Sequence, residues 1–175
     1  MTGAMLETAR LRLRRLRPTD EAALVALDSD PEVMRYVGSP SGVRGPAETL
    51  DWSRKKILAD HGRQGWWAIE GRDDGPFHGL GLLLPMPAGG DVEVGYRLCR
   101  ASWGQGIATE ASGALVEYAF GTVGLARLVA VIYPDNRASR RVLEKLGFVC
   151  DGPFEYRGAH VDHFALAAAA WRART

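Results

Sequence analysis

Residues 103–111 read Trp103-Gly104-Gln105-Gly106-Ile107-Ala108-Thr109-Glu110-Ala111 and join a predicted strand, VEVGYRL (92–98), to a predicted helix at 109–120. Glycines allow positive φ angles and let a ligand approach the backbone closely. The start of a helix adds free N–H groups and the positive end of the helix dipole. The stretch therefore predicts a cradle for a phosphate or pyrophosphate, unless its glycines only close a turn.

Two better-known phosphate loops are disfavoured by the residues around these glycines. A P-loop needs Lys followed by Ser or Thr after its last glycine, and this stretch contains no lysine. A Rossmann fingerprint needs Gly or Ala where Thr109 stands, and it belongs to repeated strand–helix–strand units. Here the preceding strands follow one another through short turns.

Hydrophobic patterns predict the remaining elements. Before the loop they indicate a strand at 9–16, a helix that Thr19 caps and that ends near Leu27, a short helix from Pro31, a helix at 47–60 with Leu50, Ile57 and Leu58 inward, and strands at 65–70, 78–84 and 92–98. After it they indicate a helix at 109–120, a strand at 127–133, a helix at 139–147 with a glycine cap, and strands at 148–152 and 162–168.

Connection lengths predict the topology. Short turns between the strands at 65–98 favour antiparallel pairing, whereas the strand–helix–strand unit from 92 to 133 requires a parallel pair. The predicted fold class is α/β (α+β), with a mixed, mostly antiparallel central sheet and helices on both faces. The 175 residues are expected to form a single domain.

Composition excludes several classes of protein. A net charge of +1 lacks the basic field of a nucleic-acid-binding domain, and no apolar run is long enough for a membrane span. The chain reads as cytoplasmic, with Cys99 and Cys150 as reduced, buried thiols. No metal site is expected, because the four histidines (His61, His78, His160 and His163) have no recognised zinc spacing.

A second motif identifies the cradle. The segment NRASRRVLEKLGF (136–148) resembles the N-x-x-S…LEKLGF segment of the GNAT superfamily of N-acetyltransferases. The loop at 103–111 resembles that superfamily's Q/R-x-x-G-x-G/A motif, with Gly106 and Ala108 on its last two small positions. Together with LRLRRLRPTD (11–20), these motifs look most like the RimJ/RimL-type ribosomal-protein acetyltransferase branch, in which an aromatic residue such as Trp103 is usual.

The resemblance implies acetyl-CoA as cosubstrate, entering where the two central parallel strands splay apart. The implied cofactor contacts are the backbone of Leu98, Cys99 and Arg100 for pantetheine, the N–H groups of Gly104, Gln105, Gly106, Ile107, Ala108 and Thr109 for pyrophosphate, Asn136 for a pantetheine amide, and Ser139 near the sulfur. Two of these residues also have structural interpretations: Asn136 could tolerate a turn, and Ser139 could cap a helix. Arg140 and Arg141 could reach a CoA phosphate or be solvated.

Acetyl transfer needs a base for the ammonium and an acid for the departing thiolate. The resemblance suggests Glu93 as the base, although a glutamate opposite an apolar row is often solvated or paired, here with Arg97. Ser139 and Tyr133 are the acid candidates, with Tyr96 weaker because it lies on the expected core face. Tyr133 could instead cap the sheet edge.

The acceptor is less well specified. The resemblance favours the α-amine of a protein N-terminus, and the alternatives are a small amine (aminoglycoside, polyamine or amino acid), another acyl group on CoA, or a non-catalytic acyl-CoA-sensing module. Aromatic and acidic residues outside the cofactor scaffold would suit a cationic amine. They are Trp52, Trp66, Trp67, Asp51, Asp60, Glu155, Tyr156 and Asp162, with one tryptophan of the pair at 66–67 expected in the core. A homodimer is also expected from the resemblance.

Overall fold

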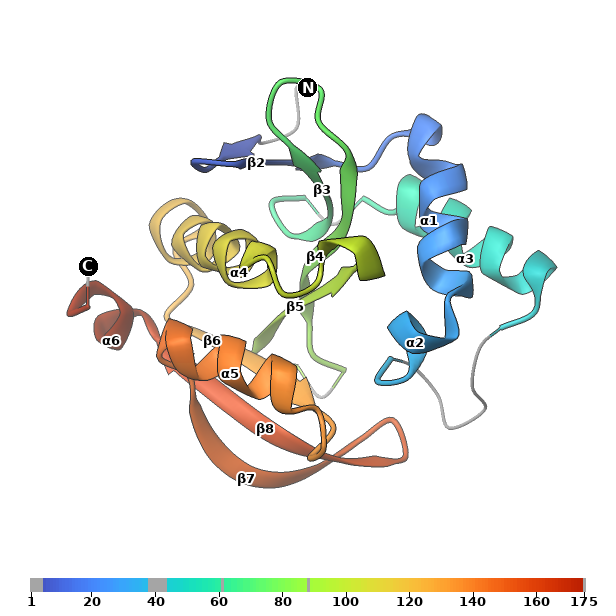
Figure 1. The fold of residues 1–175 in the computed structure, drawn as a ribbon. Coiled ribbons are helices and arrows are strands. Elements are labelled where there is room, and N and C mark those ends of the chain that lie inside the picture. The colour runs from blue at the N-terminus through green and yellow to red at the C-terminus, as the bar shows by residue number, and fades with distance from the viewer. Residues whose placement is uncertain (1–4, 38–43, 61, 88, 175) are drawn as a thin grey trace.

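The computed structural model describes residues 5–37, 44–60, 62–87 and 89–174. An eight-stranded sheet runs in the order β1-β2-β3-β4-β5-β6-β8-β7 (Figure 1). Its strands are β1 (Leu6–Glu7), β2 (Leu11–Arg15), β3 (Gly65–Gly71), β4 (Phe77–Pro85), β5 (Val92–Leu98), β6 (Arg127–Ile132), β7 (Val149–Tyr156) and β8 (Ala159–Ala167). Neighbouring strands pair antiparallel except β5 and β6, so the predicted mixed sheet with one parallel crossover is confirmed.

Helices lie on both faces of the sheet (Figure 1). They are α1 (Glu21–Ser29), α2 (Pro31–Met34), α3 (Pro46–Leu58), α4 (Ile107–Glu117), α5 (Arg137–Leu146) and α6 (Ala168–Arg172). On one face Leu80 of β4 packs with Leu24 and Leu27 of α1. On the other face Leu115 of α4 lies so close to Gly81 that a Cβ there would come within 2.8 Å of it. Because side chains alternate along β4, these contacts place α1 and α4 on opposite faces.

The larger hydrophobic core lies between the sheet and the helices α4 and α5. Leu115, Leu146 and Phe148 are buried in it, and Trp67 is the core member of the tryptophan pair. The predicted glycine cap is also confirmed: Gly147 ends α5 in a left-handed conformation, and its N–H donates to the Glu144 carbonyl. No helix in the described ranges is long and apolar enough to cross a membrane.

Two helix predictions at the N-terminal side are wrong. Thr19 does not cap α1, because Pro18–Asp20 form a 3-10 turn and the Asp20 carboxylate accepts the Arg17 N–H at 2.7 Å. Leu58 does not face inward: it is 81% exposed, and the buried face of α3 is polar instead. The buried residues of that face are Thr49, Ser53 and Lys56.

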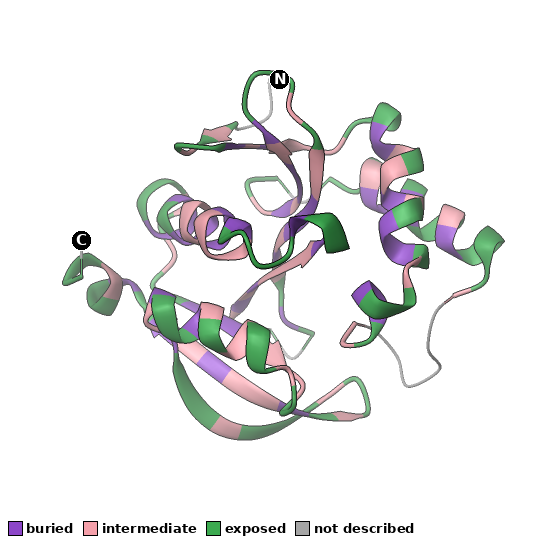
Figure 2. Ribbon diagram, viewed as in Figure 1, coloured by how far each residue is buried: buried purple, intermediate pink, exposed green. Residues whose placement is uncertain are grey.

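Cys150 is exposed and Cys99 is half-buried, so the prediction of two buried thiols is wrong. Cys150 belongs to β7, which lies at the edge of the sheet beside β8 and is exposed along most of its length (Figure 2). An edge strand has a neighbour on one side only, which leaves its side chains more open to solvent.

Candidate active site

The parallel strands β5 and β6 meet at one register pair, Glu93 and Val129, and then separate. The Cys99 N–H donates to the His78 carbonyl of β4 at 2.9 Å, so odd-numbered residues of β5 bond to β4. The backbone groups of Tyr96 and Leu98 therefore point toward the gap. A cavity of about 1060 Å³ fills this region and reaches both faces of the sheet.

Many residues predicted for the site line this cavity. They are Glu93, Leu98, Gly104, Gly106, Ile107, Ala108, Thr109, Tyr133, Asn136 and Ser139. The described lining does not include Cys99, Arg100 or Gln105. The Cys99 N–H is already bonded to β4, and the Leu98 carbonyl accepts the Trp103 indole N–H at 2.9 Å. Cofactor contacts through these backbone groups remain a prediction.

The glycine loop has the geometry of an anion cradle. Gly104 and Gly106 have φ angles of +74° and +78°, which residues other than glycine rarely adopt. A Cβ atom added to Gly104 would meet nothing within 4 Å, so the space beside it is open. The first helical bond of α4 runs from the Glu110 N–H to the Gly106 carbonyl. The N–H groups of Ile107, Ala108 and Thr109 precede it, so they are available to an anion such as the pyrophosphate of CoA.

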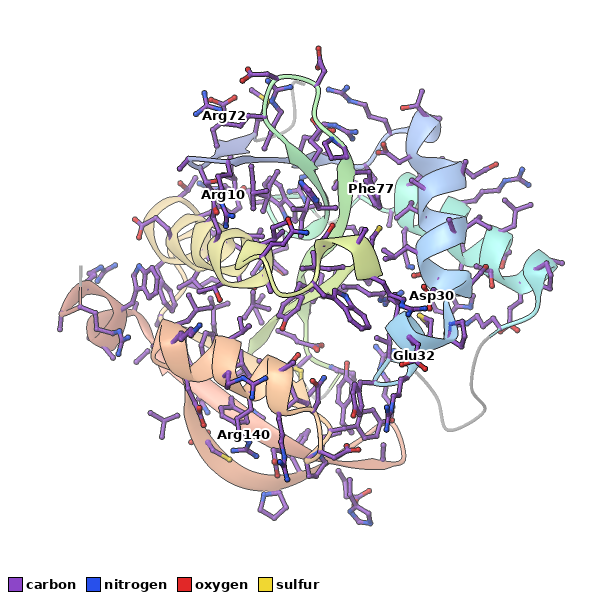
Figure 3. All side chains as sticks on the ribbon, viewed as in Figure 1. Arg10, Asp30, Glu32, Arg72, Phe77 and Arg140 are labelled. Atoms are coloured by element: carbon purple, nitrogen blue, oxygen red, sulfur yellow. The ribbon has the colours of Figure 1, made fainter. Side chains whose placement is uncertain are left out.

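An arginine from the N-terminal segment clasps this loop, a contact that sequence reasoning missed. The Arg10 guanidinium binds the Glu110 carboxylate (Nε to Oε2, 2.6 Å) and donates to the Gln105 carbonyl at 2.9 Å. The same carboxylate accepts the Thr8 hydroxyl at 2.6 Å. Figure 3 shows Arg10 beside α4. The clasp fixes the loop conformation from outside the cavity.

On the α5 face, a tyrosine and a serine share a hydrogen bond. The Tyr96 hydroxyl lies 3.1 Å from Ser139 Oγ, and burial raises the pKa of Tyr96. Ser139 is not the helix cap: Asn136 caps α5, its Oδ1 accepting the Ser139 N–H at 3.1 Å. Tyr96 packs against the core as expected, but its hydroxyl reaches the gap beside Ser139.

On the opposite face, Glu93 lies at the point where the strands separate. The Tyr156 hydroxyl donates to Glu93 Oε2 at 3.0 Å. Burial raises the pKa of Glu93, although the bond from Tyr156 and the charge of Arg157 oppose this shift. Burial and the nearby Glu93 charge also raise the pKa of Tyr156 to about 12, so this hydroxyl stays a donor. Pairing of Glu93 with Arg97 is wrong, because Arg97 binds Asp28.

Two other predicted residues border the cavity. Tyr133 follows β6 and packs at a tilt against Tyr36, with 6.2 Å between ring centroids. Arg141 of α5 belongs to the lining, whereas its neighbour Arg140 binds Asp162 of β8 and lies outside it (Figure 3).

The predicted acidic acceptor surface is absent from the described lining. Asp51, Asp60, Glu155 and Asp162 all lie outside it, engaged with Lys55, the Gly62 N–H, His160 and Arg140 respectively. Trp52, Trp66 and Tyr156 do line the cavity. The part of the described lining beside α1–α3 is mainly cationic. Its cations are Arg35, Arg44, Lys55, Lys56 and Arg97, and the acidic residues of the described lining are Glu32 and Glu93. The described residues, which omit His61, contain no group of three metal-ligating side chains.

Known proteins are similar to this chain in sequence and in architecture. The sequence profile of the acetyltransferase (GNAT) domain matches residues 10–149. The uncharacterized N-acetyltransferase YoaA of Bacillus subtilis (strain 168) is 34% identical over 154 residues, which cover 85% of this chain and 84% of YoaA.

Solved structures with coenzyme A bound have the same fold. RimL, named as a ribosomal-protein α-N-acetyltransferase, superimposes with a TM-score of 0.78 at 22% identity, covering 95% of this chain and 99% of RimL. A spermidine N-acetyltransferase from Vibrio cholerae, holding CoA and spermine, also has a TM-score of 0.78, at 18% identity over 94% of this chain and 99% of that one. The chain belongs to the GNAT acetyltransferase family and is an acetyl-CoA-dependent N-acetyltransferase.

Proposed function

We propose that the protein transfers acetyl from acetyl-CoA to the α-amine of a protein or peptide N-terminus, within one ternary complex. The observation that carries the proposed transfer step is the position of Glu93, buried at the separation of β5 and β6 and held by Tyr156. A carboxylate there borders both the cofactor gap and the acceptor end of the cavity. Acetyl-CoA, when bound, supplies the thioester carbonyl that the amine attacks.

The cofactor contacts fit the residues present. The N–H groups of Ile107, Ala108 and Thr109 would hold the pyrophosphate, and Gly104 leaves the approach open. Pantetheine would pass between β5 and β6, where the Tyr96 and Leu98 backbone points into the gap. Asn136 Oδ1 already accepts the Ser139 N–H and so caps α5, which leaves the amide NH₂ of Asn136 as a donor for a ligand.

Glu93 is assigned the role of general base. An ammonium must lose a proton before its nitrogen can attack, and a peptide α-amine has an ordinary pKa of about 7.7–8.0. Burial raises the pKa of Glu93 toward that of the amine, which makes the carboxylate a stronger base. Tyr156 orients the carboxylate, and its hydrogen bond favours the ionised form, which partly opposes the rise in pKa that burial causes.

The departing CoA thiolate needs a proton. We assign its delivery to the hydroxyl pair of Tyr96 and Ser139, on the cofactor side of the gap, with Tyr133 as the other candidate. Burial keeps the Tyr96 hydroxyl protonated until the thiolate forms. Direct transfer needs no covalent nucleophile, so Cys99 and Cys150 have no assigned role.

The acceptor assignment rests on charge. A polyamine carries several ammonium groups, and the cations beside α1–α3 would repel it. A peptide N-terminus presents one amine, and an α-amine is the acceptor class named for RimL. The proposal therefore favours a peptide over a polyamine or an aminoglycoside.

The test is CoA release from acetyl-CoA with three separate acceptor pools: N-terminal peptides, polyamines and aminoglycosides. Turnover confined to peptides, with the acetyl group mapped to the α-amine by mass spectrometry, is the expected result. Turnover on small amines alone would overturn the acceptor. Acetyl-CoA binding without turnover in any pool would favour the sensing module.

A further inference from the structure

We infer that the acceptor carries a carboxylate several residues from its reacting amine, and that Lys56 and Arg97 recognise it. This inference rests on the proposed function and names the substrate class: peptides with an acidic side chain shortly after the N-terminus. Three observations carry it: an unbalanced buried charge, the scarcity of acidic residues around it, and its distance from Glu93.

The first observation is a buried cluster of two cations on one carboxylate. Lys56 of α3 and Arg97 of β5 both bind Asp28 of α1, and their side chains are 5%, 11% and 2% exposed respectively. One carboxylate balances only one of the two cations, so a positive charge is left over inside the protein. A buried charge without a partner is costly.

That excess charge borders the cavity. Lys56 and Arg97 are both lining residues, and the ammonium of Lys56 also lies 5.3 Å from the ring centre of Trp66. Burial and the neighbouring charge of Arg97 lower the pKa of Lys56 despite its bond to Asp28. A carboxylate bound in the cavity would reduce the repulsion between Lys56 and Arg97. With Asp28 it would give two carboxylates for the two cations.

The second observation is that little else can balance the charge. The acidic residues in the described lining are Glu32 and Glu93. Glu32 is exposed on α2 (Figure 3), and Glu93 is bonded to Tyr156. Residues 38–43, which the structure does not describe, contain no acidic residue. The cations Arg44 and Lys55, which both lie over the Trp52 ring, add positive charge to this part of the cavity.

The third observation is a distance along one strand. Glu93 and Arg97 are four residues apart on the same face of β5, which separates their Cα atoms by about 13 Å at about 3.3 Å per residue. A free α-amino acid holds its amine and carboxylate on one carbon, so these two groups span much less than this separation. An extended peptide advances about 3.3–3.6 Å per residue, so position four lies about 10–11 Å from position one. The lengths of the Glu93, Arg97 and peptide side chains cover the remaining separation, so an acidic side chain at position two to four would fit.

The test compares short peptides with amidated C-termini, in which one glutamate is moved from position one to position six and matched to glutamine at each position. We expect kcat/KM to favour glutamate by about tenfold or more at positions two to four, the effect of one charge-assisted hydrogen bond. Free amino acids form a second arm. Equal rates for glutamate and glutamine at every position, or a preference for free amino acids, would overturn the inference.

Substitutions test whether the glutamate preference comes from the cluster of Lys56, Arg97 and Asp28. Lys56→Met leaves Asp28 and Arg97 as a balanced pair, so the protein should fold and bind acetyl-CoA normally while the glutamate preference falls mainly through KM. Lys56→Arg should restore it. The matched control is Arg54→Met, which removes the same charge from α3 at an exposed residue that binds Glu21 outside the cavity. A preference that survives Lys56→Met, or is lost equally in Arg54→Met, would contradict the assignment.

Binding separates failure of this inference from failure of the proposed function. If no acceptor is turned over, the α-N-acetylated glutamate and glutamine peptides can still be titrated against the CoA complex by calorimetry. Tighter binding of the glutamate peptide, abolished in Lys56→Met, would support the carboxylate site without catalysis. Equal binding would refute it.

Discussion

The buried cluster on α1, α3 and β5 predicts an asymmetric response to mutation. Asp28→Asn keeps the shape of the side chain but leaves Lys56 and Arg97 buried without a counter-charge. Removing one partner of a buried ion pair costs about 3–5 kcal/mol, a large fraction of the roughly 5–15 kcal/mol that stabilises a domain. Asp28→Asn is therefore expected to be among the most destabilising single polar substitutions in this chain.

The magnitude converts to a measurable melting temperature. For a chain of 175 residues, each kcal/mol changes Tm by about 2–4 °C, so Asp28→Asn should lower Tm by about 6–20 °C. Burial alone would raise the pKa of Asp28, but the charges of Arg97 and Lys56 outweigh it and hold the pKa below its ordinary value. The stability that Asp28 contributes is thus present above its unfolded pKa and lost as pH falls through its lower folded pKa.

The assay is thermal and urea unfolding of wild type, Asp28→Asn and Lys56→Met at neutral pH and in acid. Lys56→Met removes the excess cation and leaves one balanced pair, so it should cost much less than Asp28→Asn. The gap between wild type and Asp28→Asn should close in acid. Equal losses for the two variants, or a gap that is independent of pH, would refute the charge-balance argument.

Four further changes test the site. Glu93→Gln should lower kcat by about a hundredfold or more at neutral pH, and less above the amine pKa of about 8, where no base is needed; a loss independent of pH in a kcat profile would indicate a structural role. Tyr156→Phe removes a bond that favours the charged carboxylate, so the acidic limb of the kcat/KM profile should move to higher pH; an unmoved limb would contradict this pairing. Gly106→Val forces a branched side chain into a left-handed conformation at the cradle and should raise the acetyl-CoA Kd at least tenfold by calorimetry, with circular dichroism as the control for folding; unchanged affinity would exclude the cradle. Glu110→Gln weakens the clasp on the same loop and should raise that Kd by a smaller factor than Gly106→Val; an equal or larger effect would place Glu110 in the cradle itself.

Much of the fold follows from local patterns in the sequence. The strand at 92–98 is predicted to the residue, and the parallel pairing with 127–132 follows from the helix between them. These predictions succeed because alternation, helical periodicity and turn residues act within a few residues of one another. The glycines of the loop also indicate a local structure without help from distant residues, because positions with a positive φ favour glycine.

The site needed contacts that no local pattern encodes. Glu93 meets a tyrosine 63 residues away, and Arg10 meets a carboxylate 100 residues away. Each residue stands out in the sequence only as one more charged or aromatic side chain. Leu58 shows the reverse case: hydrophobicity placed it inside, whereas the fold buries Lys56 because Asp28 is there to bind it.

In the proposed mechanism, the two faces of the sheet hold different parts of the chemistry. Because side chains alternate along β5, Tyr96 extends toward Ser139 of α5, while Glu93 and Arg97 lie on the opposite face, where they contact Tyr156 of β7 and Asp28 of α1. One strand thus carries the acid candidate, the proposed base and a proposed acceptor contact within five residues. The motifs that carry the family resemblance, the glycine loop and Asn136, lie on the proposed cofactor side. The acceptor side depends on which side chains α1 and α3 bring to β5, so substitutions there can change specificity without disturbing acetyl-CoA.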